Sequence, residues 1–523
     1  MPNGNDTENF VRIEEEHTVQ SFLTKHPYNS ANKVMRWWQL VWYCFVALII
    51  VVLFLRNDIP IGGYHIYFSH MIELFCMFYI VVILLKLVSI SMSIAKDSQV
   101  RVTPEETAEL SDDELPVYTI LVPLFHEKDV ASKIVHAIEQ MDYPQEKLDI
   151  KLLLEPDDEE TRSVLRNIDL PSCFELIIVP HSLPRTKPKA CNHGLARAKG
   201  KYLVIFDAED RPEPDQLRKA VAGFKKVGEQ TVCLQAKLNY FNPRQNWLTR
   251  FFTVEYSTWF DLYLPGLHTL GWPIPLGGTS NHFKTSVLKE IGGWDPFNVT
   301  EDCDLGIRLH RMGHKTEILD STTWEEANSQ LGNWIRQRSR WIKGYIQTHL
   351  VYMRHPLETI RRLGLWGTFG FLTSVGGLAL MLLLNPLFWT IGITYLVLLG
   401  LDLVAMRGDL SAFWSLSVEQ RLSWKMIYVD ASGDPISNVA SVVFYVITLA
   451  LLLGNLVFIA ISVFACRRRR MHDLIPYALL SPAYWVLISI GAWKGALQLI
   501  SRPFYWEKTR HGLITTPEDE QSP

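Results

Sequence analysis

The chain has 523 residues, enough for two or three domains, and is 48% hydrophobic and 20% charged, with 17 tryptophans. A net charge of −4 without a stripe of Lys and Arg argues against nucleic acid as a partner. The seven Cys are scattered with no CxxC, so they predict neither a zinc site nor a disulfide framework, and they fit a reduced cytosolic face. The composition is typical of a membrane protein with aromatic residues available for interfacial belts or for stacking on sugars.

The N-terminal segment, residues 1–34, is expected to be a cytosolic tail. It is polar and acidic at Glu14–Glu16 and has no apolar core, so it is not a cleaved signal peptide. Residues 1–30 show no periodicity, which predicts a flexible or surface-lying segment.

Two apolar runs follow, Trp37 to Leu55 and about Ile66 to Ile94, and each is long enough to cross a bilayer. Basic residues lie outside both runs, at Lys33, Arg36, Lys96 and Arg101. The positive-inside rule then places both outer ends in the cytosol. Residues 35–95 are therefore predicted to form a transmembrane hairpin, followed by an acidic linker, residues 96–116.

Residues 117–350 have the pattern of a cytosolic α/β domain. Apolar runs predict four strands and two of the helices between them: strands Val117–Val122, Asp149–Leu154, Glu175–Val179 and Tyr202–Phe206, and helices 129–140 and 188–199. Such alternation favours a mainly parallel sheet, in which ligands bind at the carboxyl ends of the strands. Four acidic residues fall there: Glu155, Asp157, Asp207 and Glu209.

Residues 351–500 are predicted to form interfacial and transmembrane helices, before a C-terminal tail, residues 501–523. The run Phe369–Val404 is broken at Asn385-Pro386, and reads either as a hairpin of two spans or as one kinked span after an interfacial helix. Residues 405–437 are polar, and spans are expected at Val439–Ala465 and about Ile475–Leu499. The hairpin gives six spans and places Arg467–Arg470 outside, whereas the kinked span places them inside, as the positive-inside rule favours.

Three short motifs could carry chemistry, and each also has an ordinary structural interpretation. Asp207-Ala208-Glu209-Asp210 could hold a divalent cation between carboxylates, or could be a solvated acidic turn. Thr300-Glu301-Asp302 could supply a general base near a helix start, or could cap that helix.

The third motif is Gln337-Arg338-Ser339-Arg340-Trp341, on a predicted helix. Arg340 could clamp phosphate oxygens, and Trp341 offers an apolar face to a sugar ring. The alternative is a basic amphipathic helix at the membrane surface.

Taken together, the order of these motifs resembles the processive membrane glycosyltransferases of family 2, which include cellulose, chitin and hyaluronan synthases. The series is a strand-end acid, Asp-x-Glu, the turn Gly278-Thr279-Ser280, Thr-Glu-Asp, and Gln-x-x-Arg-Trp. The resemblance implies a GT-A-type α/β domain combined with an α-helical transmembrane domain. The tail Trp506-Glu-Lys-Thr also resembles cytosolic C-termini of bacterial relatives, which favours six spans.

The resemblance also implies roles for individual residues. Asp302 matches the catalytic base, and Asp207 with Glu209 matches the cation site, although Asp210 could replace Glu209. Residues matched to nucleotide-sugar binding are Pro123, Glu127, Glu155 or Asp157, Lys189, Asp207 and Arg340. Residues matched to the acceptor side are Gly278, Thr279, Ser280, Glu301, Gln337 and Trp341. Phe125 and His126 depart from the family's Tyr and Asn.

The implied function is inverting polymerisation of a nucleotide sugar, expected to be a UDP-hexose, into a β-linked polysaccharide that is threaded across a bacterial-type inner membrane. Mg²⁺ or Mn²⁺ would be the cofactor. Implied partners are the UDP-sugar, the growing glycan, membrane lipids and possible accessory or regulatory subunits. The alternatives are transfer of one sugar to a lipid carrier, and an inactive membrane receptor or scaffold.

Overall fold

The computed structural model describes residues 22–56, 58–61, 64–96, 98–405, 453–505, 507–509 and 512. The chain forms two compact units that alternate along the sequence. Unit 1 contains Met1–Val34, Val88–Ala379 and Ser462–Pro523, and unit 2 contains Met35–Leu87 and Leu380–Ile461.

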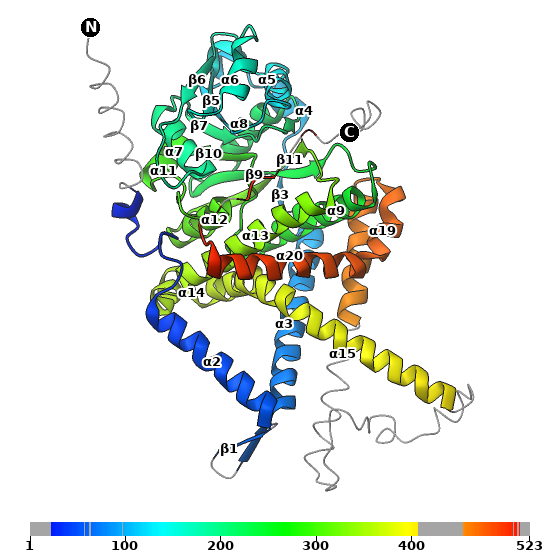
Figure 1. Ribbon diagram of the computed structural model, residues 1–523. Coiled ribbons are helices and arrows are strands. Elements are labelled where there is room, and N and C mark those ends of the chain that lie inside the picture. The colour runs from blue at the N-terminus through cyan, green and yellow to red at the C-terminus, as the bar shows by residue number, and fades with distance from the viewer. Residues whose placement is uncertain are drawn as a thin grey trace. The chain divides into compact units, whose positions relative to one another are not determined.

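Unit 1 is built on a nine-stranded sheet in the order β3-β11-β9-β10-β7-β4-β5-β6, with β8 paired to β11 (Figure 1). All pairs are parallel except those of β10 with β7 and β9 and that of β8 with β11. The strands are β3 (Gln99–Val100), β4 (Tyr118–Leu124), β5 (Leu148–Leu154), β6 (Phe174–Ile178), β7 (Tyr202–Ile205), β8 (Arg211–Pro212), β9 (Thr231–Tyr240), β10 (Asn281–Lys284) and β11 (Lys315–Glu325). The predicted α/β architecture with a mainly parallel sheet is confirmed.

The strands form where the sequence is apolar on both faces of the sheet. β5 is buried at every position, and its one Lys–Asp pair is satisfied internally, with Lys151 Nζ 2.7 Å from Asp149 Oδ1. Helices and η segments of the domain complete the core: α4 (Pro104–Ala108), η1 (Asp112–Glu114), α5 (Ala131–Glu139), η2 (Gln145–Lys147), α6 (Glu159–Arg166), α7 (Lys187–Arg197), α8 (Gln216–Lys226), α9 (Trp247–Thr258), η3 (Trp259–Tyr263), α10 (Leu264–Thr269), α11 (Thr285–Glu290) and α12 (Glu301–Arg311).

The expectation of a loose N-terminal tail is wrong for residues 22–34. Phe22 is buried, Ser30 Oγ donates to Asp295 Oδ1 at 3.0 Å, and Arg354 donates to the Ser30 carbonyl at 2.8 Å. The predicted linker is also partly structured, because it supplies edge strand β3. Both segments are therefore built into unit 1.

Among the described residues, three helices are long and apolar enough to cross a membrane: Leu74–Lys96, Pro356–Thr390 and Ser481–Ser501. Trp37–Leu53 is a shorter apolar helix. The helices and strands that contain or adjoin the apolar segments before residue 406 are α2 (Trp37–Arg56), β1 (Asp58–Ile61), β2 (Tyr64–Tyr67), α3 (Phe68–Lys96), α14 (Pro356–Phe371), η4 (Leu372–Gly377) and α15 (Leu378–Ala405).

The hairpin expected at Asn385-Pro386 is wrong, because α15 continues through Pro386. Proline removes one backbone donor, and an apolar helix can bear that loss without reversing the chain. The predicted polar segment and the first part of the span at Val439–Ala465 fall within residues 406–452, outside the described residues; residues 453–468 are helical.

Arg467–Arg470, which the six-span prediction would place outside, belong to unit 1. Arg469 NH2 donates to Asp261 Oδ1 at 2.9 Å, and Asp261 lies in η3 of unit 1. After this contact the chain forms η5 (His472–Leu474), α19 (Ile475–Leu479) and α20 (Ser481–Ser501).

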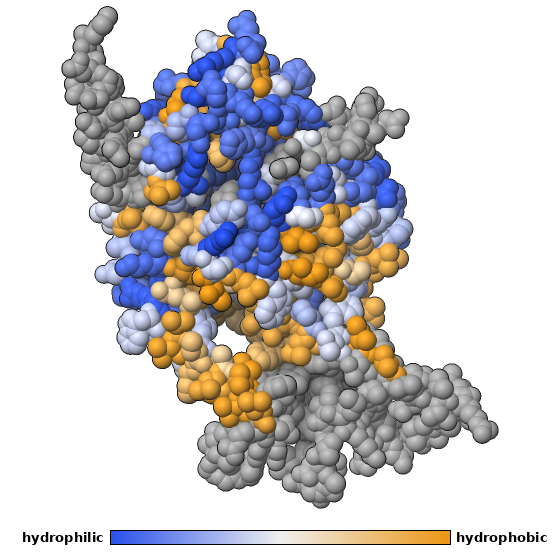
Figure 2. Space-filling view, in the orientation of Figure 1, coloured by the Kyte–Doolittle hydropathy of each residue, from blue (hydrophilic) through white to orange (hydrophobic). Residues whose placement is uncertain are grey.

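Helix α20 packs along α13 (Leu331–Tyr352), the helix that contains the Gln-x-x-Arg-Trp motif (Figure 1). Its opposite face exposes an apolar row at Val486, Ile490, Trp493, Leu497 and Ile500. Figure 2 shows hydrophobic residues gathered over this part of unit 1, and hydrophilic residues over the part that holds α5 and α6.

Candidate functional site

Acidic residues follow β7 at the carboxyl edge of the sheet. Asp207 and Glu209 are half-buried, whereas Asp210 is buried. Asp210 Oδ2 accepts hydrogen bonds from the Asp207 N–H at 2.7 Å and from the Thr279 hydroxyl. Asp210 therefore holds the turn in shape through Oδ2.

The turn before β10 brings Gly278 against these acids. The Thr279 hydroxyl donates to the Ile205 carbonyl at 3.0 Å, and the Ser280 hydroxyl donates to Thr323 Oγ1 at 2.6 Å. Both hydroxyls are buried and bonded within the protein, so their role in this structure is to fix the turn rather than to contact an acceptor.

Gly278 marks the point where three functional side chains meet. A β-carbon placed on it would lie 3.4 Å from Asp302 Oδ2, 3.9 Å from Lys187 Nζ and 4.0 Å from Asp207 Oδ2. The predicted base and the predicted cation ligand, a hundred residues apart in sequence, thus border the same small space.

Asp302 reaches this space from the first turn of α12. Its Oδ1 accepts the Cys303 N–H at 2.7 Å. Burial raises the pKa of Asp302 to about 6, although Lys187 and Arg340 lower it. Burial and the neighbouring Asp302 raise the pKa of Glu301 to about 8.

Helix α13 lies directly beside this start of α12. A β-carbon on Gly344 would be 2.2 Å from Thr300 Oγ1, so only glycine permits this approach. Arg340, on the same helix, is close enough to Glu301, Asp207 and Asp302 for these carboxylates to raise its pKa, against a larger lowering by burial. Arg340 therefore lies near these acidic residues.

The other arginine of the motif, Arg338, has a different environment. It forms a two-pronged ion pair with Glu255 of α9, with NH1 to Oε1 at 2.7 Å, and also bonds Tyr484 of α20 at 3.1 Å. Its guanidinium lies over the rings of Phe252 and Trp341, at 4.5 and 4.7 Å.

Trp341 and Gln337 lie on this side of α13. The Trp341 ring is half-buried beside Tyr256, at 6.2 Å between ring centroids. Gln337 Oε1 accepts a hydrogen bond from the Asn328 side-chain amide at 3.4 Å.

A second group of predicted residues gathers at the ends of β4 and β5. Lys189 Nζ is 3.4 Å from Glu155 Oε1, and Arg185 bonds both Glu155, at 3.3 Å, and Asp157. The Arg185 guanidinium lies 4.7 Å above the Phe125 ring. A flat aromatic and cationic surface bordered by carboxylates suits a nucleotide base.

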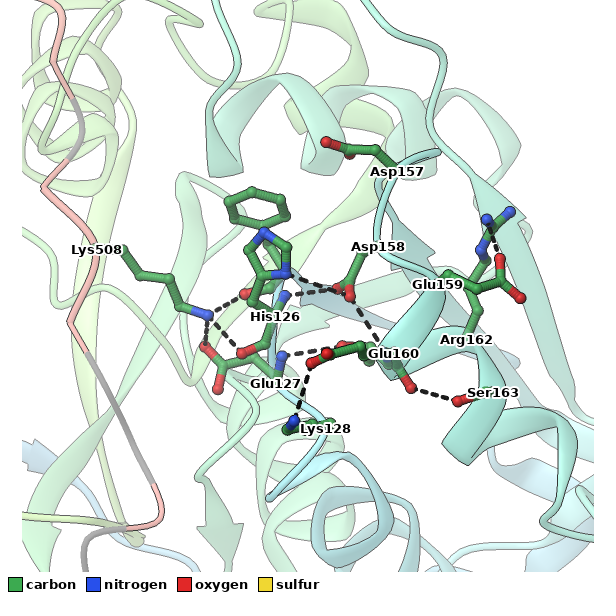
Figure 3. A network of polar contacts seen from close by, with 12 residues as sticks. His126, Glu127, Lys128, Asp157, Asp158, Glu159, Glu160, Arg162, Ser163 and Lys508 are labelled. Atoms are coloured by element: carbon green, nitrogen blue, oxygen red, sulfur yellow. Dashed lines mark hydrogen bonds and ion pairs between the residues drawn. The ribbon is translucent and has the colours of Figure 1, made fainter.

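Pro123 is half-buried near the end of β4, and the chain then turns through His126, which has a positive φ of 53°. Asp158 accepts the His126 N–H at 2.5 Å. From the other side, Lys508 donates to the His126 carbonyl at 2.7 Å and pairs with Glu127 at 3.1 Å (Figure 3). Residues from the C-terminal segment therefore border the predicted donor site; Trp506 lies outside the described residues.

The carboxylates of Asp207 and Glu209 suit a hard divalent cation that is also bound by a phosphate group. Among the described residues, no group of three or more His, Cys, Asp or Glu side chains could hold a metal ion. Mg²⁺ is commonly bound by one or two carboxylates together with substrate phosphates and water. Asp207 and Glu209 provide such a pair, so the fit depends on a phosphate-bearing ligand.

The sequence patterns missed three residues of this site. The predicted motif includes Lys189 and not Lys187. Neither Arg185 nor Glu325 belongs to a predicted motif. The strand-end rule could have found Glu325, since it ends β11. Burial, and then the nearby Asp210 and Glu209, raise its pKa.

Comparison with known proteins gives a consistent result. Residues 116–344 match the family described as "Glycosyltransferase like family 2". The "Probable glycosyltransferase YdaM" of Bacillus subtilis is 23% identical over 310 residues, which cover 58% of this chain and 73% of that protein. The "Beta-monoglucosyldiacylglycerol synthase" of Synechocystis is 28% identical over 264 residues, 49% of this chain and 54% of that protein.

Among solved structures, the chain is similar to the mannosyltransferase PcManGT from Pyrobaculum calidifontis in complex with GDP-Man and Mn²⁺. The identity is 18% and the TM-score 0.37, covering 57% of this chain and 86% of that chain.

Proposed function

Since residues 116–344 of this chain match the family described as "Glycosyltransferase like family 2", we propose that the protein transfers a sugar from a nucleotide diphosphate to an acceptor hydroxyl, with inversion. The observation that supports this best is the meeting of Asp302, Asp207 and Lys187 around Gly278. A candidate base and a candidate cation ligand border one space there, as direct displacement at an anomeric carbon requires.

In the proposed mechanism, the base of a UDP-sugar lies against Phe125 and Arg185, near Glu155, Asp157 and Lys189. Asp302 accepts the proton of the acceptor hydroxyl as its oxygen attacks. Arg340 stabilises the charge that develops on the departing diphosphate, where fixed positive charge has its largest effect on rate. One carboxylate serves as base and none is assigned as nucleophile, so an α-linked donor gives a β-linked product.

Asp207 and Glu209 would hold Mg²⁺ or Mn²⁺, which when bound neutralises the diphosphate. The proposal covers either cation. Asp210 is assigned to the turn instead, because its Oδ2 bonds the Thr279 hydroxyl and the Asp207 N–H.

For the acceptor we propose a growing β-linked glycan whose end stacks on Trp341, with Gln337 and Glu301 nearby. Support comes from the position of Trp341 in the aromatic group with Phe252 and Tyr256, beside α20. The relatives named glucosyldiacylglycerol synthases favour a second candidate, transfer of one sugar to a lipid. The exposed apolar row on α20 would suit either product, since both bring the enzyme to a membrane.

Product length separates the two acceptors. Purified protein is incubated with each UDP-sugar and Mg²⁺ or Mn²⁺, UDP release is measured, and products are separated by size and digested with linkage-specific hydrolases. We expect a polymer that only a β-specific hydrolase degrades. A single sugar on an extracted lipid would establish the second candidate, and no UDP release with any sugar would contradict both.

We further propose an integral protein of a bacterial-type inner membrane with residues 117–350 in the cytosol. Support comes from the three apolar helices and from the basic residues that flank Trp37–Leu55 and Ile66–Ile94. The proposal also includes accessory or regulatory subunits as partners.

The pH dependence of transfer tests the role of Asp302. A base must be deprotonated to act, and burial raises the pKa of Asp302 to about 6. We therefore expect kcat/KM to be constant above this pKa and to fall about tenfold for each pH unit below it. UDP affinity measured over the same range is the control, and a flat rate profile down to pH about 5 would contradict the assignment.

A further inference from the structure

Lys187 is a buried cation at the centre of the site to which no sequence motif assigns a role. It is the first residue of α7, next to Thr186, whose hydroxyl donates to the Pro296 carbonyl at 2.8 Å. Its ammonium group bonds Asp207 Oδ1 and donates to the Gly278 carbonyl at 2.9 Å. The side chain is 14% exposed, so these contacts replace most of its water.

More acidic than basic side chains surround Lys187. Asp207, Glu301 and Asp302 lie near it, and Lys187 lowers the pKa of Glu301 and Asp302, as does Arg340 for Asp302. Of these, Asp207 is in direct ion-pair contact with the Lys187 ammonium group. Lys187 therefore acts as a counter-ion for Asp207.

The ion pair between Lys187 and Asp207 engages a carboxylate that a divalent cation would need. Two protein carboxylates hold such a cation weakly without substrate oxygens. A cation that bound Asp207 would also have to compete with an ammonium group already bonded to it. A diphosphate would offer both cations further oxygen ligands.

Resting on the proposed function, we infer that Lys187 is an internal counter-cation that makes divalent-cation binding depend on the donor diphosphate. In the donor-free site Lys187 holds Asp207 and opposes the cation. With donor present, the ammonium group has a second anionic partner, and the opposition ends. Lys187 is a positioning residue in this scheme, and its effect is a coupling free energy between two ligands.

The test measures Mn²⁺ affinity of the purified full chain by the paramagnetic resonance of free Mn²⁺, without UDP and with saturating UDP. We expect UDP to tighten Mn²⁺ binding in the wild type. In Lys187→Gln, Mn²⁺ alone should bind about tenfold more tightly, the scale of a lost charge-assisted hydrogen bond, and the ratio of the two affinities should fall accordingly.

Two variants serve as controls. Lys226→Gln makes the same change in charge on α8, where the ammonium group pairs with Glu106, and should leave the ratio unchanged. Lys187→Arg keeps the charge and can hold Asp207 with two hydrogen bonds, so Mn²⁺ alone should bind no more tightly than to the wild type. This second prediction holds even if Lys187→Gln fails to fold.

The outcomes separate this inference from the proposed function. A wild type that binds neither UDP nor Mn²⁺ overturns both. Normal binding with the same affinity ratio in Lys187→Gln, or weaker Mn²⁺ binding without UDP, overturns the inference alone. Tighter Mn²⁺ binding in Lys187→Arg would do the same.

Discussion

Asp302→Asn is expected to lower the rate of sugar transfer by about 10²–10⁴-fold, the usual contribution of a well-placed general base. The amide has nearly the same shape and cannot accept the proton. Asp302 touches the space beside Gly278, whereas the proposed base-binding surface of Phe125 and Arg185 lies at the ends of β4 and β5. UDP affinity should therefore change little.

The measurement pairs single-turnover transfer with equilibrium UDP binding on the same preparation. Glu301→Gln is the matched neighbour, since it makes the same chemical change one residue earlier on α12. Wild-type-like turnover by Asp302→Asn, or a larger loss in Glu301→Gln, would show that Asp302 is not the base.

The second large effect concerns the two arginines of one motif, which should fail in different ways. Arg338→Met leaves Glu255 without the partner that holds it by two hydrogen bonds, and is expected to cost about 3 kcal/mol of unfolding free energy. Arg340→Met should leave the thermal midpoint close to that of the wild type and lower transfer by about 10²–10³-fold, as loss of a preorganised charge does.

Thermal unfolding followed by tryptophan fluorescence, together with the transfer rate, distinguishes the two losses. Glu255→Gln should reproduce the instability of Arg338→Met, and the double variant should lose less than the two single changes combined, because they disrupt one interaction. Equal loss of stability in Arg338→Met and Arg340→Met would refute the division of roles.

The sheet could be predicted because its strands are marked by short-range patterns. β4, β5 and β7 are apolar on both faces, and polar residues follow them directly, so the positions of Glu155 and Asp207 followed from the sequence. The acidic side of the candidate site was predicted by the same rule.

Contacts between distant segments could not be predicted in this way. Nothing local to Arg338 distinguishes it from Arg340, because its partners Glu255 and Tyr484 come from α9 and α20. Lys187 and Lys189 lie two residues apart on one helix, and only the fold decides that one faces Asp207 and the other Glu155.

The prediction for the apolar region around Asn385-Pro386 was wrong for a different reason. A proline in an apolar run can bend a helix or end it, and the sequence Asn385-Pro386 alone does not decide between these outcomes. Similarly, the apolar row on α20 suits a lipid surface, while its other face suits α13. Hydropathy records the first property and not the second.

The interleaving of the two units has a consequence for biosynthesis. Ser30 and Ala31 bond Asp295, and Lys508 bonds Glu127, so segments made early and late in translation both complete unit 1. Between them the ribosome must deliver the apolar helices of unit 2. Unit 1 can therefore reach its final form only after those helices have been synthesised. The order of translation itself would keep an unfinished chain from completing unit 1 before its apolar helices have been made.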